Sequence, residues 1–329
     1  MAEAITVDVD GRPVRLSNLA KVLYPRSGFT KGEMVDYYRQ IAAVMLPHLA
    51  GKPCTRVRCP DGIADSHAEK PQRRISFYEK NPPSGAPDWF RTGLVLGSDA
   101  RVNYPIVDDL ATLLVLANLA SLELHVPQWR FTEPDSEPSA NLDPQAAGHP
   151  RVETLVVDLD PGADLPFAKV VLAAQLVGGL LTTDQLTPQV RSSGGNGLQV
   201  YVAIEPADAA AVTVYCRSLA TRLGQIQPDL FTLNIARAGR TRKVLVDANQ
   251  NQPGRNTIAP YSLRAREIDA GPTVAAPLDW AELDGVTDRR EILFTPAQIL
   301  DRVSDEGDLA ADLLPGAPRD RLPPTPETD

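Results

Sequence analysis

Two aspartates separated by one residue end an apolar run in the segment 156–162, Val-Val-Asp-Leu-Asp-Pro-Gly. Residues i and i+2 of a strand point to the same face, roughly 7 Å apart, so Asp158 and Asp160 are predicted to converge while Leu159 turns into the core. Paired carboxylates at the end of a buried strand repel each other and favour a divalent cation. A strand that runs into an acidic turn explains the same letters, so the motif alone decides little.

Two further motifs add to this picture. The segment 243–247, Lys-Val-Leu-Val-Asp, repeats the pattern of an apolar run ending in a carboxylate, so Asp247 could supply a third ligand. Such an all-oxygen ligand set suits Mn²⁺ or Mg²⁺. Residues 194–197, Gly-Gly-Asn-Gly, lie between two predicted strands and would let the backbone approach a ligand. A plain hairpin loop is the commoner explanation of such glycines.

The charges of the chain are unevenly distributed. The net charge is -9, yet residues 15–80 hold 12 Lys or Arg against 6 Asp or Glu, and residues 234–266 hold 7 against 1. Residues 267–329 hold 5 basic against 15 acidic side chains. Two basic segments on either side of an acidic pair suit a phosphate-rich ligand gripped on one face. Solvated basic faces without a partner remain the alternative.

Composition predicts a globular protein of the reducing cytosol. A chain of 329 residues with 43% hydrophobic residues is long enough to bury a substantial core. Cys54, Cys59 and Cys216 are odd in number and lack nearby Cys or His partners, which argues against disulfides and a zinc site. We see no secretory signal and no apolar run long enough to cross a membrane. We therefore expect no membrane contact and a cytoplasmic, nucleoid-associated protein.

Local signals place the elements that would position these residues. Residues 5–16 alternate around Asp10-Gly11, which predicts a hairpin. Thr30-x-x-Glu33 is a capping box that opens a helix ending before Pro47, with Lys31 in its first turn. We also predict helices over residues 165–182 and 207–223, and two more that begin at Asp108 and at Thr295. Strands are predicted over residues 56–58, 190–193, 198–204 and 243–247.

Five motifs together resemble a known family: residues 22–25 (Val-Leu-Tyr-Pro), 125–131 (His-Val-Pro-Gln-Trp-Arg-Phe), 157–162, 193–199 and 258–264 (Ile-Ala-Pro-Tyr-Ser-Leu-Arg). The chain resembles the polymerase domain of bacterial ligase D, a branch of the archaeo-eukaryotic primase superfamily, from about residue 5 to about residue 310. It looks like a stand-alone actinobacterial paralogue, without ligase or nuclease segment. The resemblance implies an α/β (α+β) fold with a mainly antiparallel central sheet flanked by helices, and an active-site cleft. We expect one domain over residues 1–314 and a disordered Pro-rich tail over 315–329.

The resemblance also implies roles for residues that match the family's motifs. Two divalent ions would be held by the three aspartates and would activate the primer 3′-hydroxyl and clamp the triphosphate. The implied nucleotide-binding residues are His125, Ser193, Asn196, Gln199, Gln250, Arg264, Phe77 and Tyr78. The implied grip on a DNA 5′-phosphate consists of Asn18, Lys21 and Lys31, with Lys80 as a further DNA contact.

Two positions depart from the family pattern. The glycine loop of the family reads Ser-Gly-x-Lys-Gly-x-His, whereas this chain has Asn196 and Gln199 at the last two polar places. The family's third aspartate is commonly followed by Trp, and here by Ala248. Two nucleotide-facing groups thus lose charge, so we expect loose binding of the triphosphate unless another cation compensates.

The implied function is template-directed nucleotidyl transfer that extends primers or fills short gaps in DNA repair and accepts ribonucleotides. Expected partners are gapped DNA with a 5′-phosphate, ribonucleoside and deoxyribonucleoside triphosphates, and end-joining or repair proteins, with the chain a monomer. The main alternative is a DNA-end-binding module that keeps the fold but has little or no turnover. A sugar-nucleotide site or a phosphatase nucleophile pair is a third, disfavoured by the third aspartate and the basic flanks.

Overall fold

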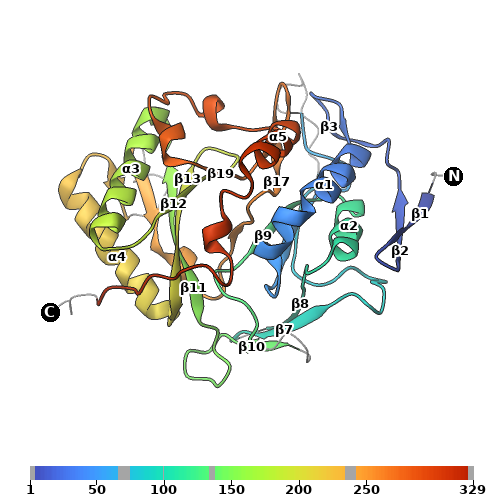
Figure 1. Ribbon diagram of the computed structural model, residues 1–329, viewed down its shortest axis with the longest axis horizontal. Helices are drawn as coiled ribbons and strands as arrows, with labels where there is room; N and C mark the ends of the chain where they lie inside the picture. Colours follow the sequence, from blue (N-terminus) through green and yellow to red (C-terminus); the bar gives the residue numbers. More distant parts are fainter. Residues whose placement is uncertain (1–3, 66–74, 99, 133–137, 234–241, 325–329) are drawn as a thin grey trace.

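The computed structural model describes residues 4–65, 75–98, 100–132, 138–233 and 242–324. Its α-helices are α1 (Lys31–Leu49), α2 (Leu110–Asn118), α3 (Phe167–Thr183), α4 (Ala209–Ile226) and α5 (Pro296–Glu306). Figure 1 shows two halves side by side, with α3 and α4 at the outer side of one and α1 and α2 in the other.

The first half is built on a six-stranded sheet in the order β14-β15-β11-β13-β12-β19. Its strands are β11 (Val152–Pro161), β12 (Gln189–Ser192), β13 (Leu198–Ala207), β14 (Phe231–Thr232), β15 (Val244–Asp247) and β19 (Ala276–Leu278). All pairings are antiparallel except β14 with β15. The expected mainly antiparallel sheet is confirmed.

Alternation along β11 decides which side chains enter the core. Leu155, Val157 and Leu159 pack with residues of α3 and α4 in one apolar cluster, whereas Val156 packs in a separate cluster on the other face. Because successive strand residues point to opposite faces, the even-numbered aspartates leave the helix-covered face. The side chains of Asp158 and Asp160 therefore point away from α3 and α4, as the alternation in the sequence predicts.

The second half contains a four-stranded antiparallel sheet in the order β16-β9-β5-β6. These strands are β5 (Thr55–Arg58), β6 (Phe77–Glu79), β9 (Ser121–Val126) and β16 (Thr257–Ile258). Helices α1 and α2 share its apolar core. The hairpin β1 (Ala4–Val9) and β2 (Arg12–Ser17) turns at Asp10-Gly11 with positive φ at both residues, as expected for this dipeptide.

Smaller strands complete the molecule. They are β3 (Val22–Tyr24) with β4 (Phe29–Thr30), β7 (Thr92–Leu96) with β8 (Arg101–Pro105) and β10 (Ser139–Asn141), and β17 (Leu263–Ile268) with β18 (Gly271–Val274). The chain crosses from β15 through the 3-10 helix η2 (Ala248–Asn251) to β16, which pairs with β9 of the second sheet. The two sheets therefore meet near the ends of β11 and β9.

Two local expectations about helix ends differ from the structure. Helix α1 continues through Pro47 to Leu49, because a proline in the last turn removes only one backbone bond and Ala50 still donates to the Leu46 carbonyl. Helix α2 is capped by Asp109 rather than Asp108, whose carboxylate accepts from the Gly51 amide instead.

Residues 315–324, the part of the Pro-rich tail that the structure describes, lie beside β13. Asp320 pairs with Ile204 of β13, and the Arg319 guanidinium donates to the Glu153 and Ile204 carbonyls. Beyond Tyr201, β13 has no neighbour in β12, so its backbone groups on that side need partners, and the tail supplies them. Residues 325–329 lie outside the described residues.

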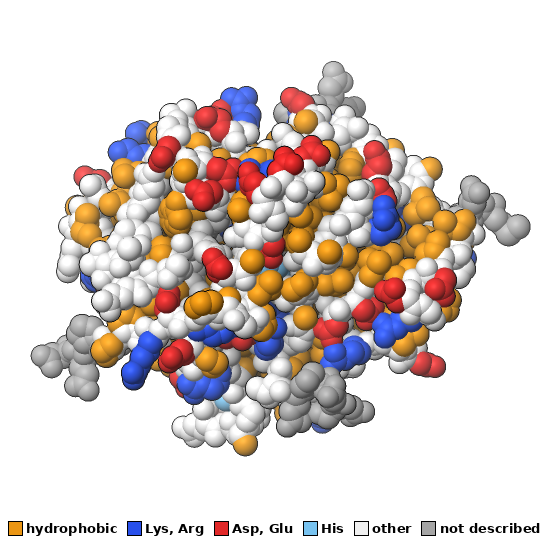
Figure 2. Space-filling model, viewed as in Figure 1, with side chains coloured by type: hydrophobic (Ala, Val, Ile, Leu, Met, Phe, Trp, Pro, Cys, Tyr) orange, Lys and Arg blue, Asp and Glu red, His pale blue; other side chains and the backbone are white. Residues whose placement is uncertain are grey.

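No helix of the described ranges combines the length and the apolarity needed to span a bilayer. The acidic C-terminal part of the sequence contributes a band of Asp and Glu over the region of α5 in Figure 2. The three cysteines are buried and unpaired, as expected.

Candidate active site

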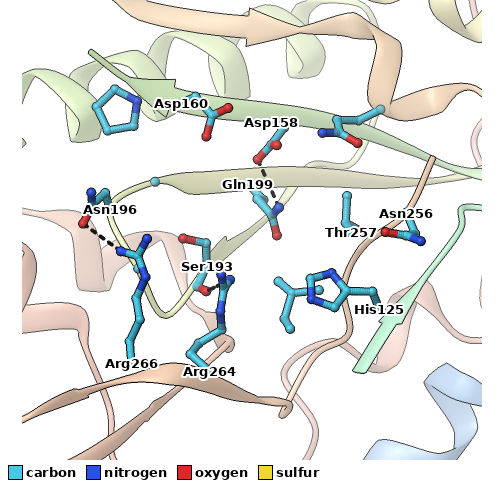
Figure 3. A pocket seen from close by; sticks show the side chains of 15 residues that line it. His125, Asp158, Asp160, Ser193, Asn196, Gln199, Asn256, Thr257, Arg264 and Arg266 are labelled. Carbon is cyan, nitrogen blue, oxygen red and sulfur yellow. Dashed lines mark hydrogen bonds between the residues drawn. The ribbon is translucent and has the colours of Figure 1, made fainter. Parts of the chain in front are cut away.

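A cavity of about 370 Å³ lies where the two sheets meet, and it collects most of the predicted site residues. Of these, it is lined by His125, Asp158, Asp160, Ser193, Asn196, Gln199, Gln250 and Arg264. In Figure 3 the aspartates of β11 lie along one wall, with Arg264, Arg266 and His125 on the opposite side. An acidic wall therefore faces a cationic one.

Asp158 occupies the centre of the acidic wall. It stands opposite Gln199 of β13 and opposite Asp247 of β15 in the sheet register. The Gln199 side-chain amide donates to Asp158 Oδ1 at 3.0 Å. Burial and the charges of Asp160 and Asp247 raise the pKa of Asp158 to about 7, although the Gln199 hydrogen bond and Arg264 act in the other direction. A nearby cation would relieve this penalty.

Asp247 is not among the residues that line this cavity, although it stands opposite Asp158 in the strand pairing and so on the same face of the sheet. Its carboxylate caps η2 by accepting from the Asn249 amide at 3.0 Å, and Gln250 Nε2 lies 3.5 Å from its other oxygen. Among the described residues, no three His, Cys, Asp or Glu side chains are gathered closely enough to hold a metal ion. The donor chemistry nevertheless fits Mg²⁺ or Mn²⁺, since Asp158 and Asp160 share a face and their repulsion calls for a cation.

The glycine loop between β12 and β13 closes one end of the cavity. A Cβ on Gly197 would meet the Leu159 carbonyl oxygen at 2.5 Å, so only glycine lets this loop reach the strand that carries the aspartates. Gly194 has φ +67, and a Cβ there would meet the Val274 carbonyl oxygen at 2.7 Å. Both glycines are thus required by close backbone approach.

Asn196, which stands where the family has lysine, is bound by two arginines. Its Oδ1 accepts from Arg266 Nη1 at 3.4 Å and also from Arg289. Arg266 itself lines the cavity. The positive charge missing from the loop is therefore present on neighbouring elements.

Glu123 holds two side chains of the opposite wall, His125 and Arg264. Its carboxylate lies 2.8 Å from His125 Nε2 and accepts from Arg264 Nε at 3.0 Å and from the Ala265 amide at 2.8 Å. Burial alone would raise the pKa of Glu123, but the hydrogen bond from His125 and the charge of Arg264 hold it at about 2. Arg264 also donates to the Ser193 carbonyl at 2.6 Å, which ties this wall to the glycine loop.

The predicted aromatic residues lie beside the cavity rather than in it. Phe77 and Tyr78 of β6 are 44% and 56% exposed. The Tyr78 ring contacts His125 edge-on at 6.1 Å between centroids, and its hydroxyl donates to Asn256 Oδ1 at 2.6 Å. Tyr78 and Lys80 line a neighbouring groove of about 680 Å³. Exposed aromatic faces next to a lysine are available for base stacking.

The predicted phosphate grip lies elsewhere, around the start of α1. The Lys31 amide donates to the Lys21 carbonyl at 2.8 Å, and the Lys21 amide to the Asn18 carbonyl at 3.0 Å, which brings the three residues together. Lys21 is exposed and paired with Asp61. Lys31 is buried, and its ammonium donates to the Asn118 carbonyl at 2.7 Å. Burial, with the nearby charge of Lys21, lowers the pKa of Lys31 to about 8.

Sequence reasoning missed several residues of the cavity. Glu123 could have been found, because it is two residues before His125 on a strand and so shares its face. Arg266 follows Arg264 at the same spacing on β17. Arg289, Asn256 and Thr257 carry no such signal, since only the packing of distant segments brings them to the site.

The comparisons with known proteins agree with the motifs. A family model described as "LigD, primase-polymerase domain" matches residues 30–310. The multifunctional non-homologous end joining protein LigD of Mycolicibacterium smegmatis is 39% identical over 306 residues, which cover 93% of this chain and 36% of that protein. The multifunctional non-homologous end joining DNA repair protein LigD of Mycobacterium tuberculosis is 40% identical over 312 residues, covering 94% of this chain and 38% of that protein. The chain thus spans little more than a third of the length of these relatives.

The fold is likewise shared with a solved structure. The polymerase domain from Mycobacterium tuberculosis ligase D, solved in complex with DNA, superposes with a TM-score of 0.80 at 38% identity. The match covers 92% of this chain and 98% of that one. The family resemblance and the fold class predicted from sequence are confirmed, and the chain belongs to the LigD primase-polymerase domain family.

Proposed function

We propose that this chain is a template-directed nucleotidyltransferase that extends 3′ ends or fills short gaps during end-joining DNA repair. The observation that carries the proposal is the pair of facing walls: Asp158 and Asp160 on one side of the cavity, Arg264 and His125 on the other. Such a cavity accepts a triphosphate between fixed cations and a carboxylate pair suited to metal.

The carboxylates would hold Mg²⁺ or Mn²⁺, with two ions if Asp247, which stands beside Asp158 on the neighbouring strand, takes part. Bound there, the metal would supply charge neutralisation for the triphosphate and a lowered pKa for the primer 3′-hydroxyl. Gln199 keeps Asp158 oriented toward the cavity through its hydrogen bond.

The cationic wall would bind and orient the nucleotide. Glu123 fixes His125 and Arg264, so their donors are in place before a nucleotide arrives and little side-chain entropy is lost on binding. Ser193, Asn196 and Gln250 add neutral polar groups around the same cavity. Arg266 and Arg289 would replace the charge of the family's loop lysine.

DNA would contact two regions outside the cavity. Phe77 or Tyr78 would stack a base, with Lys80 beside them on the groove, and Asn18, Lys21 and Lys31 would grip a 5′-phosphate. The start of α1 is linked to the cavity, because the Tyr24 hydroxyl of β3 donates to the Arg264 carbonyl at 2.7 Å. The DNA complex of the related polymerase domain supports DNA as the partner. We also propose that the chain uses ribonucleotides, contacts other repair proteins and is a monomer.

A module that binds DNA ends without turnover is the second candidate. It is favoured by the neutral side chains of Asn196 and Gln199 and by the carboxylate of Asp247, which caps η2 and does not line the cavity.

Primer extension on a gapped, 5′-phosphorylated duplex tests both candidates, with Mn²⁺ or Mg²⁺ and with ribonucleotides or deoxyribonucleotides. We expect templated addition by the native chain and none by Asp158→Ala, which should still bind DNA because a negative charge near phosphate is removed. Asp305→Ala, an exposed change on α5, is the matched control and should extend normally. Normal extension by Asp158→Ala would contradict the polymerase assignment, and tight binding without extension by the native chain would favour the second candidate.

A further inference from the structure

A second, smaller cavity lies behind the active-site cavity and shares Thr257 and Ile258 with it. Its volume is about 30 Å³, room for roughly two water molecules. Three cationic side chains line it: Lys52 from the segment after α1, Arg130 from the segment after β9, and Arg191 from β12. They come from both halves of the molecule, so the cavity lies at the junction of the halves.

Lys52 is the unusual member of this group. Its side chain is buried, with the residue 8% exposed, and its ammonium donates no hydrogen bond to any residue of the described ranges. Burial and the nearby charge of Arg130 lower the pKa of Lys52 to about 7, although Glu153 acts in the other direction. An ammonium in this largely buried place has no protein acceptor among the described residues, so a group that offers negative charge in the cavity would stabilise it.

The carboxylates near the cavity are already used by other groups. Glu153 pairs with both Arg130 and Arg319. Asp308 lies 2.8 Å from His48 Nε2 and accepts from the Tyr261 hydroxyl at 2.5 Å.

Arg191, like Lys52, has no carboxylate partner among the residues that the structure describes. Its guanidinium lies over the Tyr201 ring at 4.1 Å from the centroid and donates only to the Ile258 carbonyl. With Lys52 protonated, the three cations that line the cavity, together with Arg319 beside Glu153, outnumber the nearby carboxylates Glu153 and Asp308.

We propose that this cavity is a binding site for one small inorganic anion, a halide or a single tetrahedral oxyanion, held by Lys52 and Arg191 beside Arg130. An anion supplies acceptors for the ammonium and the guanidinium together with the missing charge, which water cannot supply. The space is too small for a nucleotide, so the site is distinct from the active-site cavity.

A bound anion would also stabilise the position of Asp158 in the active-site cavity. The Tyr201 hydroxyl, whose ring lies under Arg191, donates to Gln199 Oε1 at 2.9 Å, and Gln199 donates to Asp158. An anion that fixes Arg191 therefore also fixes the ring, the glutamine and, through it, the central carboxylate.

Thermal unfolding in different salts tests the proposal. The chain is unfolded in sodium gluconate, whose anion is too bulky for the cavity, and chloride, sulfate or phosphate is then substituted at constant ionic strength. We expect a saturable rise in Tm, as for any ligand that binds only the folded state. A rise with chloride identifies a halide site, and a rise with sulfate and phosphate alone identifies an oxyanion site.

Lys52→Met keeps the length of the side chain and removes the charge. This variant should unfold at a higher temperature than the native chain in gluconate, because a buried unpaired charge is gone, and should lose the saturable response. Lys169→Met, an exposed change on α3, should behave as the native chain does. No saturable rise in the native chain, or an unchanged rise in Lys52→Met, would overturn the proposal.

Anomalous diffraction from native crystals soaked in bromide or in selenate keeps the test independent of variant folding. We expect a peak within hydrogen-bond distance of the Lys52 ammonium for at least one of the two anions. The absence of a peak with both would also overturn the proposal.

Discussion

Single side chains decide how the two walls of the active site are held. Glu123 is buried, yet its pKa is held at about 2 because one carboxylate serves His125, Arg264 and the Ala265 amide. On the opposite wall the pKa of Asp158 is raised to about 7 by burial and by its acidic neighbours. The two carboxylates thus differ in pKa because Glu123 is bound by His125 and Arg264, whereas Asp158 lies beside other aspartates.

The low pKa of Glu123 predicts a pH-dependent contribution to stability. Its pKa is lower in the folded state than in the unfolded chain, so the stabilisation is fully present above about pH 4.5 and is lost as the pH falls toward 2. The full effect is on the order of 3 kcal/mol. Urea unfolding of the native chain between pH 6 and pH 3 should show a steeper loss of stability than unfolding of Glu123→Gln. If stability fell with pH equally steeply in both proteins, the low pKa of Glu123 in the folded state would be contradicted.

Arg266 should carry the charge that Asn196 lacks. We expect Arg266→Gln to raise KM for the nucleotide about tenfold, as the loss of one charge-assisted contact predicts. Adding Asn196→Lys to this variant should restore most of the loss, because it returns the cation to the loop. Arg290→Gln, which removes an exposed arginine paired with Asp288, is the control. Steady-state primer extension gives KM for the native chain, the single variant, the double variant and the control. If Asn196→Lys does not lower the raised KM, Arg266 does not supply the charge that the loop lacks.

At the scale of elements, the glycine loop and β17 position the site. The loop packs against the end of β11 through Gly197 and against β18 through Gly194, whose close neighbour is the Val274 carbonyl. β17 brings Arg264 and Arg266 to the same loop from the other half. The cavity is thus shaped by backbone contacts that larger residues could not make.

Gly197→Ala should therefore be destabilising. The added methyl would lie 2.5 Å from the Leu159 carbonyl oxygen, so the loop or β11 must shift at a cost of about 1 to 3 kcal/mol. Gly195→Ala is the matched control, since its methyl would meet nothing closer than Ser193 Oγ at 3.4 Å. Thermal unfolding should show a lower Tm for Gly197→Ala alone. A similar Tm for both variants would mean that the loop adjusts freely.

At the scale of the whole molecule, the active site exists only because the two halves meet. The acidic wall belongs to the six-stranded sheet and the cationic wall to the other half, and β16 joins them by pairing with β9. The start of α1 lies at the outer side of the second half (Figure 1). A gapped DNA would then contact the cavity with its 3′ end and the start of α1 with its 5′-phosphate.

This arrangement predicts that Lys21 acts only on phosphorylated gaps. Lys21→Ala should weaken binding of a 5′-phosphorylated gapped duplex by about 1.5 to 3 kcal/mol, the value of a charge-assisted contact. Binding of the unphosphorylated duplex should change little, as should binding by Lys169→Ala. Titration of labelled duplexes measures both, and equal weakening on the two duplexes would mean that Lys21 only attracts DNA in general.

From the sequence alone we could predict several strands of the central sheet, the capping boxes of α1 and α5, and the shared face of Asp158 and Asp160, because strand periodicity and caps depend on neighbours in the chain. It also indicated the family through its five motifs. Tertiary structure decided what depends on distant segments: the place of Asp247 beside Asp158, the two arginines at Asn196, and the carboxylate of Glu123 between His125 and Arg264. It decided the place of residues 315–324 beside β13 as well, since an unpaired stretch of β13 is a property of the sheet. The buried charge of Lys52 likewise arises only where the two halves pack together.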